Sequence, residues 1–231
     1  TEHQILLEKT YQSFARNSAN LEEADREKYR ELSTKISQLS LKFGQNVLKE
    51  LNTYEMWLTA DDVDGLPESA LQAAKDAAKA KGKEDAYLIT LQAPSYSPFM
   101  KYSSRRDLRE KLYMMYNKRN TQGEYNNLEL IKELSFARYE MAKLLGYDNY
   151  ADYVLRRRMA ENVDNVYNLL YQLRDAYTPV LKKDLKELEK FAAELEGKKI
   201  KLEAWDYSYY YNKLKDSKYA LNDELLRPYF E

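Results

Sequence analysis

Hydrophobic residues recur at helical spacing through most of the chain. The clearest stripe lies in the region 18–54, where apolar side chains are three or four positions apart over many turns: Leu32, Ile36, Leu39, Phe43, Val47 and Leu51. Polar and acidic residues precede this stripe, as is typical of a helix N-terminus. A shorter amphipathic helix is predicted before it, over residues 5–14. The first 53 residues are therefore predicted to be helical.

The pattern changes at Tyr54. Residues 54–59 (YEMWLT) and 86–91 (AYLITL) are rich in aromatic and β-branched side chains and predict two short strands. Between them, Pro67 occupies a first helical turn, and an Ala-rich helix ends near Gly82. The proline-containing stretch QAPSYSP, residues 92–98, is predicted to be a loop. Residues 54–102 are thus expected to form a small α/β insert.

Helical patterns resume in residues 103–231. Helices are predicted over the ranges 104–123, 126–146, 147–158 and 161–197, the last with Pro179 inside it. The predicted fold class is mainly α: a long-helix bundle lobe that carries the small α/β insert.

Composition limits the partners of the protein. The chain of 231 residues has 44% hydrophobic and 32% charged residues and a net charge of −1. It has no basic excess to neutralise a phosphate backbone, so we expect no nucleic-acid partner. No apolar run approaches the length of a membrane span, so we expect no membrane partner. Cysteine is absent, which leaves the cellular compartment open.

The residues available for catalysis are few. His3 is the single histidine, and zinc sites usually need at least two nitrogen or sulfur ligands, so this chain is not expected to bind zinc or another cofactor. The same shortage argues against a Ser-His-Asp triad, and the isolated glycines argue against a phosphate-binding loop. A hydrolase with paired carboxylates stays open as an alternative, because Asp and Glu are plentiful.

Two charged clusters have competing interpretations. Asp61, Asp62 and Asp64 could hold a cation, but Leu71 stands where a calcium loop needs Glu, so a solvated turn is favoured. The consecutive residues Arg156–Arg158 could hold an anionic substrate end. Helical geometry would point them in three directions, so surface ion pairs are favoured over a single patch.

The 22 tyrosines include a run near the end of the chain. Tyr207, Tyr210, Tyr211 and Leu214 follow i, i+3, i+4, i+7 spacing, which predicts a buried helical stripe. Tyr209 is then expected to face elsewhere, where it could line a groove. The residues alone indicate a helical, aromatic-rich protein without catalytic or metal-binding residues of its own.

Several strings in order carry a family resemblance. They are ELSTKISQLSLKFGQNVLKE, GLPESAL, AKAKGKEDAYLITL, LREKLYMMYNKRN, MAKLLGYDNYADY, WDYSYYYNKL and LRPYFE, and they lie between residues 31 and 231. Together they resemble the zinc oligopeptidases of the thimet oligopeptidase, oligopeptidase A and peptidyl-dipeptidase Dcp group, with the greatest likeness to bacterial Dcp. The resemblance extends over residues 21–231, nearly the whole chain.

The resemblance implies a fragment of a larger enzyme. In this family the zinc-binding H-E-x-x-H helix lies downstream of LRPYF, so residues 1–231 would be one fragment of a two-lobed peptidase that lacks its catalytic half. Its sub-regions would be residues 1–53, 54–102 and 103–231. The parent enzyme would bind zinc, occupy the cytoplasm, and cut short unstructured peptides in a channel, with release of C-terminal dipeptides implied by the Dcp likeness. The fragment itself would be inactive.

An exposed interface follows from this hypothesis. Tyr229, Phe230 and part of the helix over residues 205–214 are expected to be exposed here, because the missing half would cover them. The alternative is a stand-alone helical module that binds a peptide or a protein through tyrosine-rich surfaces.

Overall fold

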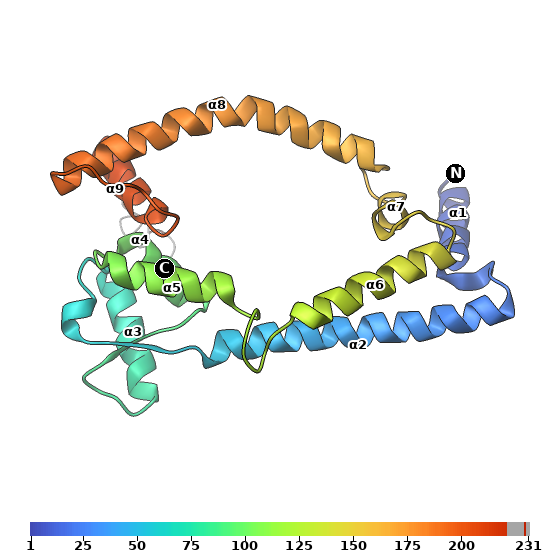
Figure 1. Ribbon diagram of the computed structural model, residues 1–231, viewed down its shortest axis with the longest axis horizontal. Helices are drawn as coiled ribbons and strands as arrows, with labels where there is room; N and C mark the ends of the chain where they lie inside the picture. Colours follow the sequence, from blue (N-terminus) through green and yellow to red (C-terminus); the bar gives the residue numbers. More distant parts are fainter. Residues whose placement is uncertain (221–228, 230–231) are drawn as a thin grey trace. The chain divides into compact units, whose positions relative to one another are not determined.

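The computed structural model describes residues 1–220 and Tyr229. Its elements, coloured along the chain in Figure 1, are α1 (Glu2–Phe14), η1 (Ala15–Ala19), α2 (Glu23–Thr53), β1 (Met56–Leu58), η2 (Ala60–Asp62), α3 (Glu68–Ala80), β2 (Tyr87–Ile89), α4 (Ala93–Tyr102), α5 (Arg106–Lys118), α6 (Leu128–Leu144), α7 (Tyr150–Leu155), α8 (Val163–Glu196) and α9 (Tyr207–Tyr219). The fold is mainly α, as predicted. Among the residues described, no helix has both the length and the apolarity to cross a membrane.

The chain divides into two compact units. Unit 1 consists of residues 1–46 and 126–175, and unit 2 consists of residues 47–125 and 176–231. In unit 1, α2 contacts the start of α6 through Asn127, whose side-chain amide donates to the carbonyl oxygen of Phe43 at 3.2 Å and accepts from the Asn46 amide at 2.8 Å. The predicted stripe on α2 is half-buried along its length. The few buried residues of unit 1 are Ser18, Asn127, Ala137, Met141 and Ala142.

Unit 2 contains the larger hydrophobic core. The two predicted strands form an antiparallel pair, with Met56 opposite Ile89 and Leu58 opposite Tyr87. The core lies between this pair, α3, α4 and α5, and its buried members are Met56, Leu58, Val63, Leu66, Ala74, Ile89, Leu91, Phe99, Met100 and Leu112. A second cluster joins the end of α8 to α9 through Leu188, Ala192, Tyr209 and Tyr210.

The segment predicted to be a loop, residues 92–98, is instead the first part of α4. Pro94 lies in the first helical turn, where a backbone N–H has no partner within the helix. Pro98 lies inside the helix and removes one hydrogen bond. Burial of Phe99 and Met100 offsets this loss, because both side chains are almost fully removed from water.

Candidate functional site

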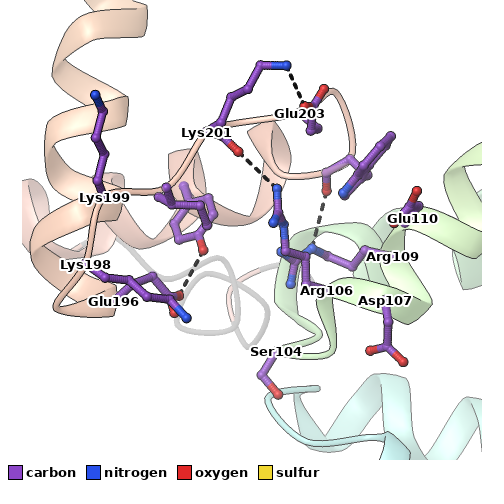
Figure 2. Close-up of a pocket in the computed structure, with 13 residues that line it drawn as sticks. Ser104, Arg106, Asp107, Arg109, Glu110, Glu196, Lys198, Lys199, Lys201 and Glu203 are labelled. Atoms are coloured by element: carbon purple, nitrogen blue, oxygen red, sulfur yellow. Dashed lines mark hydrogen bonds and ion pairs between the residues drawn. The ribbon is translucent and has the colours of Figure 1, made fainter.

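A candidate site in unit 2 is a pocket of about 840 Å³. α5 forms one side of it, and the end of α8 with the segment 198–205 forms the other. Figure 2 shows Arg106 and Arg109 extending from α5 beneath this segment. The two arginines stand three residues apart on α5, so they lie on the same side of the helix.

Both arginines bind one buried carboxylate, Asp206, whose side chain is 0% exposed. Arg106 donates from Nε and Nη2 to Asp206 at 3.0 and 2.6 Å, and Arg109 donates from Nη2 at 3.0 Å. The backbone N–H of Glu203 donates to the same carboxylate at 3.0 Å. Asp206 therefore joins α5 to the segment that leads into α9.

Backbone carbonyls complete the shell of the arginines. Arg109 is 1% exposed and donates to the carbonyl oxygens of Ser103 at 2.7 Å and Trp205 at 3.3 Å, while its guanidinium lies 4.2 Å from the centre of the Tyr209 ring. Arg106 donates to the carbonyl oxygen of Lys201 at 3.0 Å. A buried charge that is paired and hydrogen-bonded in this way stays ionised.

The electrostatics of the cluster follow from these contacts. Burial alone would raise the pKa of Asp206, but hydrogen bonds from Arg106, the Glu203 N–H and Arg109 outweigh it and hold that pKa below its ordinary value of 3.8. The hydrogen bond to Asp206 in turn raises the pKa of Arg106. Asp206 and Arg106 are therefore both charged at neutral pH.

A second polar contact lies on the same pocket wall. The Tyr210 hydroxyl donates to Glu196 Oε1 at 2.8 Å, and burial together with this acceptor raises the pKa of Tyr210. The tyrosine thus stays protonated and links α9 to the end of α8. These contacts stabilise the pocket wall, and the residues that line the pocket do not include histidine.

The acidic cluster does not converge on a cation. Asp62 accepts from the N–H and hydroxyl of Thr59 and pairs with Arg105 at 2.5 Å, which lowers its pKa. Asp64 accepts from the Ser104 hydroxyl at 2.5 Å, and Asp61 is exposed. The contacts of this turn match the structural interpretation: the carboxylates cap η2 and attach the turn to the start of α5.

The three consecutive arginines depart from the expectation. α7 ends at Leu155, so Arg156–Arg158 lie in a turn, where helical spacing does not apply. Arg156 and Arg157 consequently line the same pocket in unit 1, and none of the three forms an ion pair with another described residue. The prediction of surface ion pairs, and of three separate directions, is wrong for the described residues.

The tyrosine stripe is shifted from its predicted position. Tyr209 and Tyr210 are buried at 9% and 2% exposure, whereas Tyr207 and Tyr211 are exposed at 42% and 53%. The predicted stripe is therefore wrong at Tyr207 and Tyr211, and the prediction that Tyr209 faces away from the core is also wrong. The cause is the Arg109–Asp206 cluster, because Tyr209 packs beneath the Arg109 guanidinium and so sets the rotation of α9.

The expected interface residues have mixed outcomes. Tyr229 is 83% exposed, as expected, and the exposure of Tyr207 and Tyr211 agrees with the expectation that part of the helix over residues 205–214 is exposed. Tyr209 and Tyr210 pack within their own unit, so only the side of this helix that carries Tyr207 and Tyr211 is exposed. Phe230 lies outside the described residues.

Sequence reasoning did not find Arg106, Arg109 and Asp206. A weak signal existed in RRDLRE, where two arginines three positions apart share a helical face with Leu112. Their carboxylate partner is about a hundred residues away in sequence, so helical spacing alone could not indicate it.

Comparisons with known proteins add independent information. The family model "Peptidase family M3" matches residues 99–231. An oligopeptidase A of Haemophilus influenzae is 36% identical over 230 residues, which cover 97% of this chain and 34% of the relative. An organellar (chloroplastic/mitochondrial) oligopeptidase A of Arabidopsis thaliana is 36% identical over 218 residues, or 91% of this chain and 27% of the relative. A dipeptidyl carboxypeptidase of Escherichia coli is 26% identical over 230 residues, which cover 98% of this chain and 33% of the relative. The chain spans about a third of the length of the curated relatives it matches.

Proposed function

The chain belongs to peptidase family M3, and on that premise we propose that it forms a non-catalytic part of a zinc metallopeptidase that hydrolyses short peptides. The zinc oligopeptidase family expected from the sequence strings is confirmed by this membership. The observation that carries the proposal is the family match combined with a coverage of 34% of the oligopeptidase A relative. About two thirds of such an enzyme would therefore lie outside this chain.

The residues of this chain do not fit a zinc site. It has one histidine and no cysteine, and within the part that the structure describes no group of three or more His, Asp or Glu side chains could hold a metal ion. His3 is exposed on α1, and the Asp61–Asp64 turn is engaged in capping and ion pairing. We therefore propose that the zinc ligands and all catalytic residues belong to the remainder of the parent enzyme, and that this chain has none.

The exposed apolar face of α8 supports a missing partner. Leu188 and Ala192, near the end of this helix, are buried under α9. Within unit 2, the same stripe continues toward the N-terminus of α8 with Tyr177 and Leu181, whose side chains are 65% and 50% exposed. Exposed apolar side chains in line with a buried stripe indicate a surface that another segment covers. We propose that the catalytic half of the parent enzyme covers it.

A wall of the substrate channel is the second part of the proposal. Tyr207 and Tyr211 stack with ring centres 6.1 Å apart on the exposed side of α9. Tyrosine has an apolar ring and a polar tip, which suits contact with the backbone and side chains of an extended peptide. Short unstructured peptides are therefore the proposed ligands of this face in the assembled enzyme.

The mode of cleavage depends on the branch of the family. The likeness to Dcp implied release of C-terminal dipeptides, yet the identity with the oligopeptidase A relative, 36%, exceeds the 26% with the dipeptidyl carboxypeptidase. That order is the reverse of the one expected. We propose an oligopeptidase for the parent, and dipeptide release becomes an outcome of the test.

The arrangement of sub-regions and the compartment stay predictions. We propose that residues 1–231 act as a single fragment, although this fragment contains two compact units, residues 1–46 with 126–175 and residues 47–125 with 176–231. A cytoplasmic parent remains the expectation from the family, and the organellar name of one relative shows that compartments differ among these proteins.

A peptidase assay tests the proposal. The purified 231-residue chain is incubated with fluorogenic peptides of five to ten residues, with added zinc and with chelator in parallel. We expect no hydrolysis that the chelator removes. Chelator-sensitive turnover that follows the chain through two chromatographic steps would refute the non-catalytic assignment. In the extended protein, mass spectrometry of the products separates internal cuts from dipeptide release.

The alternative function is a stand-alone helical module that binds a peptide or a protein. The same exposed face of α8 favours it if copies of the chain cover one another. Sedimentation distinguishes the two: a monomer at micromolar concentration favours the fragment, whereas a dimer that Leu181→Ser dissociates favours the module. The matched control is Glu189→Ser on the polar side of α8.

A further inference from the structure

Unit 1 contains a second pocket, and the charged residues that line it are all arginines. Its volume is about 520 Å³, and it is lined by residues of α1, η1 and the turns that follow α6 and α7. The helices α1 and α7 are labelled near the N-terminus in Figure 1. Arg16, Arg156 and Arg157 are its charged lining residues, with Tyr11 and Tyr147 beside them, and no carboxylate lines it.

Arg16 is held in place without a carboxylate. Its Nη2 donates to the carbonyl oxygen of Tyr153 at 2.6 Å, and its guanidinium lies 4.1 Å from the centre of the Tyr153 ring. The residue is half-buried, and no described carboxylate pairs with it. A guanidinium has five N–H donors in a planar fork, so these contacts fix its orientation while leaving donors for a ligand.

The backbone around Arg16 is also held in an uncommon conformation. Ser18 is buried and has a φ of +75°, in the left-handed region that non-glycine residues seldom adopt. The bend at Ser18 ends the first helical segment and places Arg16 and Asn20 on the same pocket. Such a conformation persists only where surrounding contacts enforce it, and it is frequent at ligand sites.

Arg156 and Arg157 bring two further positive charges to the same pocket. Both are exposed at the end of α7, and neither pairs with a described carboxylate. Like charges in one cavity repel one another, and a bound anion reverses that cost while accepting hydrogen bonds from the guanidinium forks.

We propose that this pocket binds an oxyanion, that is, a phosphate or carboxylate group. Two sources supply this chemistry: a phosphate-bearing small molecule, or a short acidic peptide. The site lies within unit 1, and the proposal does not depend on the peptidase assignment.

Isothermal titration calorimetry of the 231-residue chain tests the proposal. The probes are pyrophosphate and the tripeptide Glu-Glu-Glu, with Gln-Gln-Gln as the uncharged control, all at one fixed ionic strength because salt screens exposed charges. The test variants are Arg16→Gln and the double variant Arg156→Gln/Arg157→Gln. The matched control is Arg158→Gln, which removes the adjacent arginine that does not line the pocket.

We expect wild type to bind at least one charged probe, and each test variant to bind it about tenfold or more weakly, because a charge-assisted hydrogen bond is lost. Arg158→Gln should change the affinity by less than about twofold. Binding of pyrophosphate alone identifies a phosphate-bearing ligand, and binding of Glu-Glu-Glu alone identifies an acidic peptide.

Two results would overturn the proposal. One is the absence of binding by wild type to either probe up to about 10 mM. The other is an equal loss of affinity in Arg158→Gln and in the double variant, which would indicate non-specific attraction. If Arg16→Gln fails to fold because the bond to Tyr153 is lost, the double variant at exposed positions still decides the question.

Discussion

Asp206→Asn offers the sharpest test of the structure of unit 2. The substitution keeps the size of the side chain and removes the charge that neutralises Arg106 and Arg109. Arg106 is 42% exposed, so water can solvate it, but Arg109 is 1% exposed and would be left as a buried cation. Removing one partner of a buried ion pair costs about 3–5 kcal/mol.

The contacts of Arg109 place the expected value near the low end of that range. After the substitution, the Arg109 guanidinium still donates to the backbone carbonyls of Ser103 and Trp205 and still lies over the Tyr209 ring. We therefore expect Asp206→Asn to lower the free energy of unfolding by about 3 kcal/mol. With a urea dependence of about 1–3 kcal/mol/M, the midpoint should fall by roughly 1–3 M.

Tryptophan fluorescence during urea unfolding measures this loss. Trp57 and Trp205 are the two tryptophans of the chain, and both lie in unit 2, so the signal reports that unit. The matched control is Asp107→Asn, which breaks the ion pair with Arg105 at a position 64% exposed and should change stability by less than about 1 kcal/mol. Equal midpoints for the two variants would refute the assignment of Asp206 as the buried anchor.

The pH dependence of the free energy of unfolding provides a second measure of how much Asp206 stabilises the fold. The pKa of Asp206 is lower in the folded chain than in the unfolded chain, so its contribution is present above about pH 4 and is lost as the pH falls through the folded value. The fall in unfolding free energy between about pH 4 and pH 2 should therefore be smaller in Asp206→Asn than in wild type. Parallel pH profiles for the two proteins would contradict this expectation.

Further substitutions test individual contacts by the same fluorescence assay. Gly65→Ala should be strongly destabilising, because the residue has a φ of +84° and an added Cβ would lie 2.5 Å from the Tyr102 carbonyl oxygen. The control is Gly82→Ala, at a similar φ of +79° with open space around it, which should lower the free energy of unfolding by about 1 kcal/mol. Gly65→Ala should lower it by a further ~1–3 kcal/mol. Equal losses in the two variants would contradict the close approach of residue 65 to the Tyr102 carbonyl oxygen. Tyr210→Phe removes the hydrogen bond to Glu196 and should cost about 1 kcal/mol, whereas Tyr211→Phe, at an exposed ring, should cost less than about 0.5 kcal/mol. A Tyr210→Phe variant as stable as wild type would show that this bond contributes nothing.

Local patterns predicted the elements well because the information is local. The stripe on α2 repeats over many turns, and the aromatic and β-branched runs at residues 54–59 and 86–91 correspond to β1 and β2. α4 was missed because its two prolines suggest a loop, although one lies in a tolerated first turn and burial offsets the other.

Contacts between distant residues were beyond the same reasoning. The rotation of α9 is set by the packing of Tyr209 on Arg109, which no spacing within residues 205–214 reveals. The pocket of unit 1 that Arg16, Arg156 and Arg157 line was missed for a related reason. The directions of Arg156 and Arg157 were predicted from helical spacing, but α7 ends one residue before Arg156. Arg16, the third arginine of the pocket, comes from a segment far away in sequence. Helix ends and tertiary partners are the features that periodicity determines least.

The most direct test of the central proposal is to sequence the gene beyond codon 231. We predict that the reading frame continues into an H-E-x-x-H motif followed by a later Glu, because the chain spans only about a third of its relatives and has no zinc ligands of its own among the described residues. A stop codon at position 232 would contradict the proposal that this chain is the non-catalytic part of a larger peptidase, and would favour the stand-alone helical module.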